Sequence, residues 1–353
     1  SIVFDPNQWL LETNREVQLV APPAPELVSV TGDALTSTVL VKWEPAQASG
    51  VQGFRLYRIL QDGSRLLLAD EDELTSSTAS YTVEGIGPQE SLFAGVASVW
   101  LGESDLTDIY GARPGWGSRR VLVVDGYDRG TNTPGGRNHD YSMIHGLAIA
   151  ENDVAFDTCA NEMLGAEIDL QDYAVVDWLL AEESTSDETF SDEEQALAEA
   201  YLESGGGLFV SGNEIAWDLD WKGESSDQAF FHDYLKAAYS ADDSEIYTVT
   251  GTPDGPFGRR GFAFGSGDAP YRPEYPDVLT ARDGGETILN YQGDGTAAVM
   301  YKGAFGSSAE EGGLIYMGFA FETLSSEQDR NDLMRTVLEQ LLPPAAFEGI
   351  IVK

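Results

Sequence analysis

Polar residues that can do chemistry follow four apolar, strand-like runs of this 353-residue chain. Parallel α/β sheets bind their ligands beyond the carboxyl ends of their strands, so these residues are predicted to share one crevice. A group of carboxylates with one histidine can hold calcium or another oxygen-preferring ion, or carry out acid/base chemistry. The same side chains can instead be helix caps and turn ligands in an acid-rich chain. The predicted crevice residues are Asp125, Tyr127, Glu182, Glu183, Asn213, Glu214 and Glu322, with His139 and Asp140 from the loop GTNTPGGRNHDY folding over them.

Two features near Asn213 suggest further chemistry. Ser211 lies in V-S-G, which resembles half of a G-x-S-x-G nucleophile elbow, but Phe209 stands where the first glycine should be. We therefore expect Ser211 to hydrogen-bond the turn. Trp217 and Trp221 offer flat apolar faces that suit the C–H surface of a sugar ring, although such rings more often pack internally.

Other motif-like segments lack residues that the corresponding function requires. Asp218 and Asp220 resemble the start of a calcium loop, but Lys222 occupies an oxygen-ligand position and the closing glutamate is absent. The loop GTNTPGG lacks the Lys-Ser/Thr of a phosphate-binding loop, so nucleotide binding is not expected. His145 and His232 are predicted to pack within helices. No metal site is assigned, and calcium is the one cofactor kept as a candidate.

The elements that must position these residues alternate along residues 116–343. RRVLVVDGY, VAFDTC, YAVVDWLL and LFVSG are strand-like, and their continuous apolar runs indicate strands buried on both faces. Helices are predicted over 140–152, over 191–204 with a capping box from Ser191 to Glu194, over 227–239, and from a cap at Ser325 and Gln328 to Leu342. Glycine-rich β-like runs between 240 and 305 predict an antiparallel extension.

Before residue 116 the apolar residues repeat along the chain with a different period. Prolines in Ala21 to Pro25 break the chain, and seven short alternating runs follow up to Pro114, which predicts a β-sandwich. The predicted domains are therefore an N-terminal strand segment and linker (1–22), a sandwich (23–115), an α/β domain (116–343) and a tail strand (344–353). A strand-like start at residue 1 leads us to expect a processed or truncated piece of a longer polypeptide.

The amino-acid composition limits the kinds of partner that the protein can bind. Sixty acidic against twenty basic residues give a formal net charge of −40, which repels phosphate backbones and excludes nucleic acid as a partner. The excess is expected to keep the protein soluble in a salty medium. No apolar run approaches the ~20 residues of a membrane helix, so no membrane insertion is predicted. Cys159 is the single cysteine, which rules out an intramolecular disulfide.

The sandwich region resembles a fibronectin type III domain over about 90 residues. Trp43 in VKWEP matches the second-strand core tryptophan of that family, and Tyr57 in FRLYR matches its third-strand tyrosine. Phe93 departs from the pattern, since a tyrosine is commoner in that strand. The resemblance implies a spacer or a binding platform.

The region around GGGLFVSGNEI resembles the class I glutamine-amidotransferase-like fold, a flavodoxin-like three-layer sandwich. That resemblance places Asn213 where the family has its Cys or Ser nucleophile, and Glu322 where a histidine would follow the last strand. Both catalytic positions are thus degenerate. VLVVDGYDR, HDYSMIHGLAI and AFFHDYLKAAY also resemble domains of large secreted bacterial proteins that are called golvesin-like, xanthan-lyase-like or N-acetylmuramoyl-L-alanine-amidase-associated. This implies a secreted or cell-surface location, but no catalytic motif.

Three functions remain open. The first is a non-catalytic structural or binding module on a degenerate scaffold, with polysaccharide or cell-wall glycan as a candidate partner. The second is a hydrolase or lyase acting on polysaccharide or peptidoglycan through Glu214, Glu322 and Asp125. The third is a self-assembling surface or filament subunit whose terminal strands, SIVFDPNQW and FEGIIVK, pair between copies.

Overall fold

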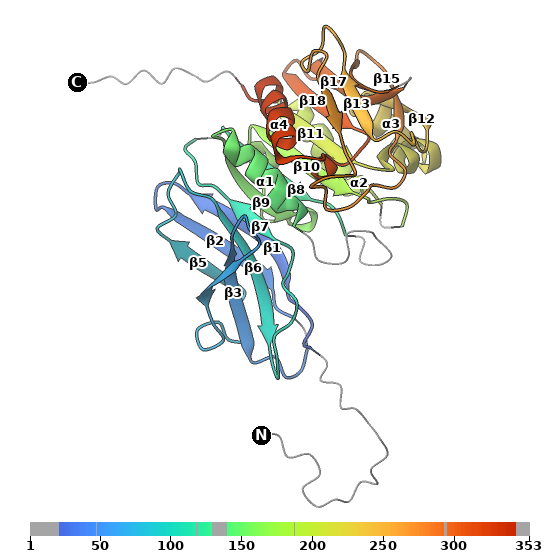
Figure 1. Cartoon of the computed structure of the whole chain (residues 1–353). Coiled ribbons are helices and arrows are strands. Elements are labelled where there is room, and N and C mark those ends of the chain that lie inside the picture. The colour runs from blue at the N-terminus through green and yellow to red at the C-terminus, as the bar shows by residue number, and fades with distance from the viewer. Residues whose placement is uncertain are drawn as a thin grey trace, which may run out of the picture.

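The computed structural model describes residues 21–46, 48–117, 119–128, 140–186, 188–292 and 295–343. The terminal strands expected at residues 1–22 and 344–353, and the candidate His139, lie almost wholly outside this part. Figure 1 shows a β-sandwich at one end of the molecule and an α/β domain at the other.

The sandwich consists of two antiparallel sheets. The first has the order β1 (Glu26–Asp33), β2 (Thr38–Glu44), β5 (Ser80–Glu84), and the second has the order β4 (Arg65–Ala69), β3 (Gly53–Ile59), β6 (Leu92–Val99), β7 (Tyr110–Ala112). Apolar side chains alternate into the space between the sheets. Trp43 and Phe54 meet there edge to face with centroids 5.8 Å apart, and both are buried. This arrangement is a fibronectin type III-like sandwich, as the sequence predicts.

Tyr57 and Phe93 have roles beyond the sandwich core. The hydroxyl of Tyr57 donates to Glu103 at 2.8 Å, and Arg55 bridges Glu103 and Glu71 beside it. The ring of Phe93 lies 5.9 Å from that of Phe156 in the α/β domain. Phe93 is buried, so a tyrosine hydroxyl in its place would need a hydrogen-bond partner in this interior.

The α/β domain is built on five parallel strands in the order β9 (Ala155–Ala160), β8 (Arg120–Asp125), β10 (Val175–Ala181), β11 (Gly207–Gly212), β18 (Glu311–Met317). Every residue of β10 and β11 is buried, because helices cover both faces of the sheet. Helices α1 (Tyr141–Glu151) and α4 (Glu327–Leu341) pack on one face, and α2 (Asp192–Glu203) and α3 (Ser225–Asp233) on the other (Figure 1).

Helix boundaries follow local capping, with two corrections to the prediction. Ser191 and Glu194 form the expected capping box of α2. Helix α4 is capped one residue later than predicted, by Ser326, which accepts from the backbone N–H of Asp329 at 3.1 Å. Helix α3 ends at Asp233 instead of 239. Lys236 adopts a left-handed φ of 57°, and the following residues form β12 (Ala237–Ala241), paired with β15 (Val278–Ala281). Strand pairing therefore overrides helix propensity there.

The predicted antiparallel extension is present beyond β18. It comprises β17 (Thr296–Ala304), β16 (Glu286–Tyr291), β13 (Thr248–Gly251) and β14 (Gly261–Ala263). Strand β15 also pairs with β17, and β12 pairs with β15. The stretch between β14 and β15 carries Tyr271 and Asp277 back toward the carboxyl ends of the parallel strands.

The sandwich and the α/β domain share one sheet. Strand β1 pairs antiparallel with β9 through Ser29 opposite Cys159 and Val30 opposite Thr158. Asp157 holds the junction from β9: it accepts from the backbone N–H of Gly32 at 2.7 Å, from Arg120 at 2.8 Å and from the Tyr173 hydroxyl at 2.9 Å. An edge strand that would be open to solvent is thereby covered.

Candidate functional site

The first strand of the parallel sheet ends in an aspartate that secures the following helix. Asp125 is 4% exposed, and its carboxylate accepts from the Ser142 hydroxyl at 3.1 Å and from the backbone N–H of Tyr127 at 3.3 Å. The hydrogen bond to Ser142 fixes the first turn of α1 against the end of β8. This is the capping role that the sequence left open for Asp125.

A buried histidine lies between two buried carboxylates. Nδ1 of His145, on α1, is 2.8 Å from Oδ2 of Asp177 on β10, and Nε2 is 3.5 Å from Oε2 of Glu322. Glu322 also accepts from the Tyr271 hydroxyl at 2.6 Å. Exposure is 0% for His145, 1% for Asp177 and 0% for Glu322. We call these four residues, Asp177, His145, Glu322 and Tyr271, the buried relay.

The imidazole of this buried relay is held protonated. Burial alone would lower the pKa of His145, but the charges of Asp177 and Glu322, and hydrogen bonds to them, raise it to about 9. The relay therefore contains one cation between two acids at neutral pH. Such pairing is what keeps buried charges tolerable in a protein interior. His145 was expected to be packed within its helix, and it is, but its ionic partners were not foreseen.

Sequence reasoning missed Asp177 and Tyr271. The signal for Asp177 is present, because an acid in the middle of the apolar run VVDWLLA demands a buried partner. No local signal identifies Tyr271, which arrives from the segment between β14 and β15.

The left-handed residue of the turn after β11 lies one position beyond Asn213. Glu214, not Asn213, adopts the left-handed conformation, with φ of 55°. Asn213 is fully buried: its backbone N–H donates to the carbonyl of Ala181 at 2.8 Å and its Oδ1 accepts from the N–H of Ala320 at 3.2 Å. Asn213 thus ties three strand ends together, and the sharp-turn position carries a carboxylate.

No base lies within hydrogen-bond reach of the Ser211 hydroxyl among the residues that the structure describes. Its side chain is buried, and its Oγ makes no hydrogen bond to any residue in the described part of the chain. The expected hydrogen bond to the turn is therefore absent among those residues. Asp277 lies at the same turn and accepts from the N–H of Ala216 at 2.8 Å. Burial raises the pKa of Asp277 well above its usual range.

Tyrosines line the edge where the strands end. The ring of Tyr141 lies 5.8 Å from that of Tyr127 and 5.2 Å from that of Tyr271. All three rings are buried, and burial raises the pKa of Tyr141 and Tyr271. Glu182 and Glu183 are buried beside this edge, where they accept from the backbone N–H groups of Glu274 and Asp128. These two glutamates serve as turn ligands.

The residues predicted to share one crevice thus lie in different local environments. Glu322 pairs with His145, Tyr127 packs among the tyrosines, and Asn213 forms hydrogen bonds at the turn after β11. Asp140 is exposed at the start of α1 and its side chain makes no capping hydrogen bond. His139 lies outside the described residues. The expected calcium site stays a prediction: among residues that the structure describes, no three His, Cys, Asp or Glu side chains are placed to hold an ion.

An aromatic cluster follows the elbow directly. The π-helical turn Trp217–Lys222 places the Trp217 and Trp221 rings 6.3 Å apart and 26° from parallel. Tyr239 lies 5.4 Å from Trp221, and Nζ of Lys222 lies 4.6 Å from the centre of the Trp217 ring. Trp221 is 59% exposed. We call Trp217, Trp221 and Tyr239 the aromatic platform.

Asp218 and Asp220 are used in local hydrogen bonds. Asp218 accepts from the backbone and hydroxyl of Thr189, and Asp220 contacts His232 at 2.9 Å and the N–H of Tyr239 at 2.7 Å. The ring of His232 is thus held by Asp220.

Comparisons with known proteins add little. No family model and no curated protein matches the chain. Similar solved structures include an Fn3-like protein from Clostridium thermocellum (21% identity, 26% of this chain and 90% of that chain, TM-score 0.22) and the fn3 domain of human contactin 1 (17%, 30% and 96%, 0.23). The FN5 domain of Drosophila Lar is also similar (18%, 27% and 100%, 0.22). The strand order of β1 to β7, not these scores, defines the sandwich. No helix in the described ranges is long and apolar enough to cross a membrane.

Proposed function

We propose that this protein is a non-catalytic binding module of a secreted or cell-surface protein, built on a degenerate amidotransferase-like scaffold. One observation carries the proposal: the elbow after β11 offers Asn213 and Glu214 in place of a nucleophile, and His145, the histidine nearest the strand ends in the described residues, is buried in an ion pair. Acyl transfer needs a nucleophile within hydrogen-bond reach of a base.

The strand order supports the scaffold part of the proposal. The order β9, β8, β10, β11, β18 corresponds to 2-1-3-4-5 in chain order of the parallel strands, which is the flavodoxin-like order. Helices on both faces give the three layers expected of that class. The antiparallel extension beyond β18 would then be an addition to the scaffold.

The aromatic platform supports glycan as the ligand. A pyranose presents an apolar C–H face that stacks on an exposed indole, and the platform offers an exposed Trp221 edged by Tyr239. The polar groups of Lys222 lie beside it. A strong negative charge disfavours acidic polysaccharides, so neutral glycans suit the surface better.

The binding proposal is tested by pull-down with insoluble peptidoglycan and by calorimetry with soluble neutral polysaccharides. Trp221→Ala should weaken binding at least tenfold, because one stacked ring is lost. Trp116→Ala is the matched control, since Trp116 is 62% exposed outside the platform. Equal loss in both variants, or no binding by the unmodified protein, would contradict the proposed ligand.

A hydrolase acting on polysaccharide or peptidoglycan is the second candidate, and one observation favours it. Glu214 holds a left-handed conformation that costs a residue with a side chain about 1–3 kcal/mol. Eight other non-glycine residues of the described chain share this conformation, but Glu214 lies at the carboxyl ends of the parallel strands, where such folds place their ligands. Asp125 and Glu322 argue against it, because both are buried and hydrogen-bonded. Release of reducing ends or muropeptides that Glu214→Gln abolishes would establish this alternative.

Self-assembly through the terminal strands is the third candidate. The segments that would pair lie outside the described residues, so the structure adds no support. Sedimentation of the full chain and of a chain trimmed to residues 21–343 distinguishes an assembling subunit from a monomer.

A further inference from the structure

Two large apolar side chains are exposed on the α/β domain, counted over its described residues from the start of β8 to the end of α4. They are Trp221, which is 59% exposed, and Tyr275, which is 46% exposed. Trp221 belongs to the aromatic platform, and Tyr275 does not. Tryptophan and tyrosine are enriched at binding surfaces, because each combines a large apolar face with a polar group. Tyr275 is therefore a candidate for a further contact with a ligand.

The backbone of Tyr275 has a conformation that a tyrosine rarely adopts. Its φ of 53° lies in the left-handed region, and it is the only aromatic residue among the nine described non-glycine residues in that region. Pro276 adds to the strain, because a proline favours extended conformations in the residue before it. The half-exposed ring makes no aromatic contact or hydrogen bond with another described residue. Packing of the ring therefore does not offset the strain.

The segment that carries Tyr275 is anchored at the carboxyl ends of the parallel strands. The backbone N–H of Glu274 donates to the carboxylate of Glu182, directly after β10, at 2.8 Å. The backbone N–H of Asp277 donates to the carbonyl of Gly318, directly after β18, at 2.8 Å. These hydrogen bonds fix the backbone on both sides of Tyr275, so its exposed ring is presented from a rigid support.

A hydrogen bond joins this segment to the aromatic platform. The carboxylate of Asp277 accepts from the N–H of Ala216 at 2.8 Å, and Ala216 directly precedes the π-helical turn Trp217–Lys222. Tyr275 is two residues from Asp277, and Trp221 is five residues from Ala216. These chain lengths limit the distance between the α-carbons of Tyr275 and Trp221 to about 25 Å. The segments that carry the two exposed rings thus meet at the edge of the sheet where such folds bind ligands.

The two exposed rings offer separate faces to a ligand, because the Tyr275 ring does not contact the rings of the platform. We propose that Tyr275 forms a second stacking subsite beside the aromatic platform, and that the ligand is an oligosaccharide of neutral pyranose rings long enough to occupy both. Each aromatic ring then packs against the C–H face of a different sugar. This second subsite rests on the glycan-binding function proposed above, and it adds the chain length of the ligand.

The test is calorimetry of the whole chain with cello-oligosaccharides and chito-oligosaccharides, each offered as the disaccharide and as the hexasaccharide. Two subsites filled by one chain act together, so the unmodified protein should bind the hexasaccharide about tenfold more tightly than the disaccharide. Tyr275→Ala should weaken hexasaccharide binding about fivefold and change disaccharide binding less than about twofold, because a single stacking face is lost. Trp221→Ala should weaken the binding of both lengths.

Two further variants distinguish a contact with the ligand from a role in folding. Tyr275→Phe keeps the ring, so its affinity for the hexasaccharide should stay within about twofold of that of the unmodified protein. Tyr275→Gly removes the ring and also relieves the left-handed strain. It should lose as much affinity as Tyr275→Ala without a fall in the thermal midpoint of unfolding, which a merely structural role of the tyrosine would not produce.

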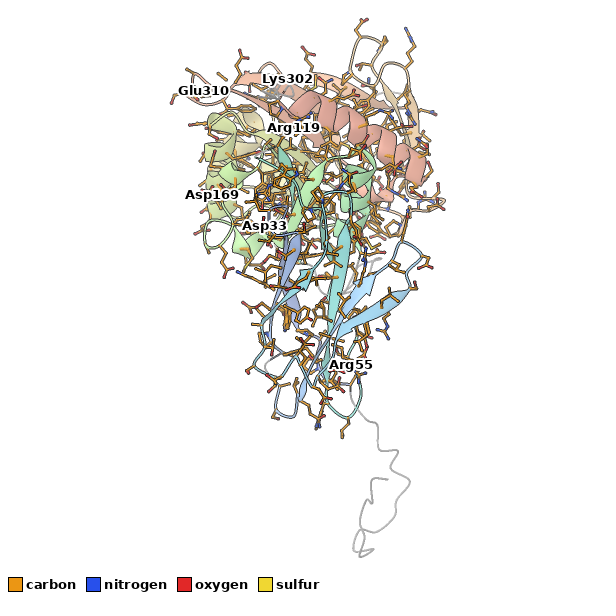
Figure 2. All side chains as sticks on the ribbon, turned by 90° about the vertical axis from the view of Figure 1, so that its left-hand side faces the viewer. Asp33, Arg55, Arg119, Asp169, Lys302 and Glu310 are labelled. Carbon is orange, nitrogen blue, oxygen red and sulfur yellow. The ribbon has the colours of Figure 1, made fainter. Side chains whose placement is uncertain are left out.

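Trp100→Ala is the matched control, since Trp100 is 41% exposed on the sandwich. Trp100 lies in the turn that leads to Glu103, the partner of Arg55 at 2.9 Å. Figure 2 shows Arg55 toward the end of the sandwich away from the α/β domain, so this control removes an exposed indole far from both subsites. Its affinity for the hexasaccharide should equal that of the unmodified protein.

The outcomes separate the second subsite from the function on which it rests. Unchanged hexasaccharide affinity in Tyr275→Ala, with binding still weakened by Trp221→Ala, would overturn the second subsite and leave the platform as a glycan site. Equal weakening of both lengths by Tyr275→Ala would also overturn it, and so would an equal loss in Trp100→Ala. Binding of neither series by the unmodified protein would overturn the second subsite, and failure of the polysaccharides as well would contradict the proposed function itself.

Discussion

The buried relay makes a pH-dependent contribution to stability that can be measured. The pKa of His145 is about 9 in the folded protein, against about 6.5 in the unfolded chain. Because the folded pKa is raised, the stabilisation is fully present below pH 6.5 and is lost as the pH rises through 9. At about 1.4 kcal/mol per unit, the contribution is about 3 kcal/mol.

The perturbation is His145→Gln, which keeps a polar side chain but removes the cation. At pH 6 the variant should be less stable by about 3–5 kcal/mol, because Asp177 and Glu322 are left buried without a charge partner. At pH 9.5 the wild-type imidazole is mostly neutral, so the difference should shrink by about 3 kcal/mol.

The assay is urea unfolding of both proteins at pH 6, 7, 8 and 9.5, followed by circular dichroism. His232→Gln is the control, since His232 sits in a partly exposed pair with Asp220 at 2.9 Å. A difference between wild type and His145→Gln that stays constant across this range would refute the assigned charge state. If His145→Gln fails to fold at pH 6, the double variant with Asp177→Asn supplies the comparison.

Three further predictions concern the junction, the elbow and helix packing. Asp157→Asn should cost about 2–4 kcal/mol, because the carboxylate accepts from Gly32, Arg120 and the Tyr173 hydroxyl; urea unfolding measures it, and a change below 0.5 kcal/mol would contradict the role of Asp157. Glu214→Gly should raise the free energy of unfolding by about 0.5–1 kcal/mol through relief of the left-handed strain, whereas a lower thermal midpoint would show that the side chain is stabilising. Gly146→Ala should cost about 1–3 kcal/mol, because the added Cβ would lie 2.6 Å from the Phe156 ring; a neutral effect in the same assay would mean that α1 can shift.

The sequence predicts only part of the environment of Asp177, the aspartate on β10. The run VVDWLLA identifies a buried strand, and the acid within it demands a partner, but the chain gives no reason to choose His145 on α1 over another cation. The pairing depends on α1 packing over β10, and Glu322 reaches the same histidine only because β18 lies two strands from β10. These are consequences of strand order, which local patterns do not encode.

The conformation of the turn after β11 was likewise only partly predictable from the sequence. The glycine stop before LFVSGNE predicts a tight turn after β11, and the turn is there. Its left-handed residue, however, is Glu214 and not Asn213, because Asn213 is held by the carbonyl of Ala181 and the N–H of Ala320 from two other strand ends.

By itself the sequence determined the sandwich, the buried strands, the capping box at Ser191 and the acidity, since each depends on periodicity, turn residues or composition within a short window. Only the tertiary structure decided which acidic side chains are buried and which line a cavity. Asp125, Asp177 and Glu322 are buried with partners, whereas Asp128 and Glu162 meet the sandwich across an open cleft. The physical reason is that burial and charge pairing depend on elements far apart in the chain, here on β1 extending the sheet at β9.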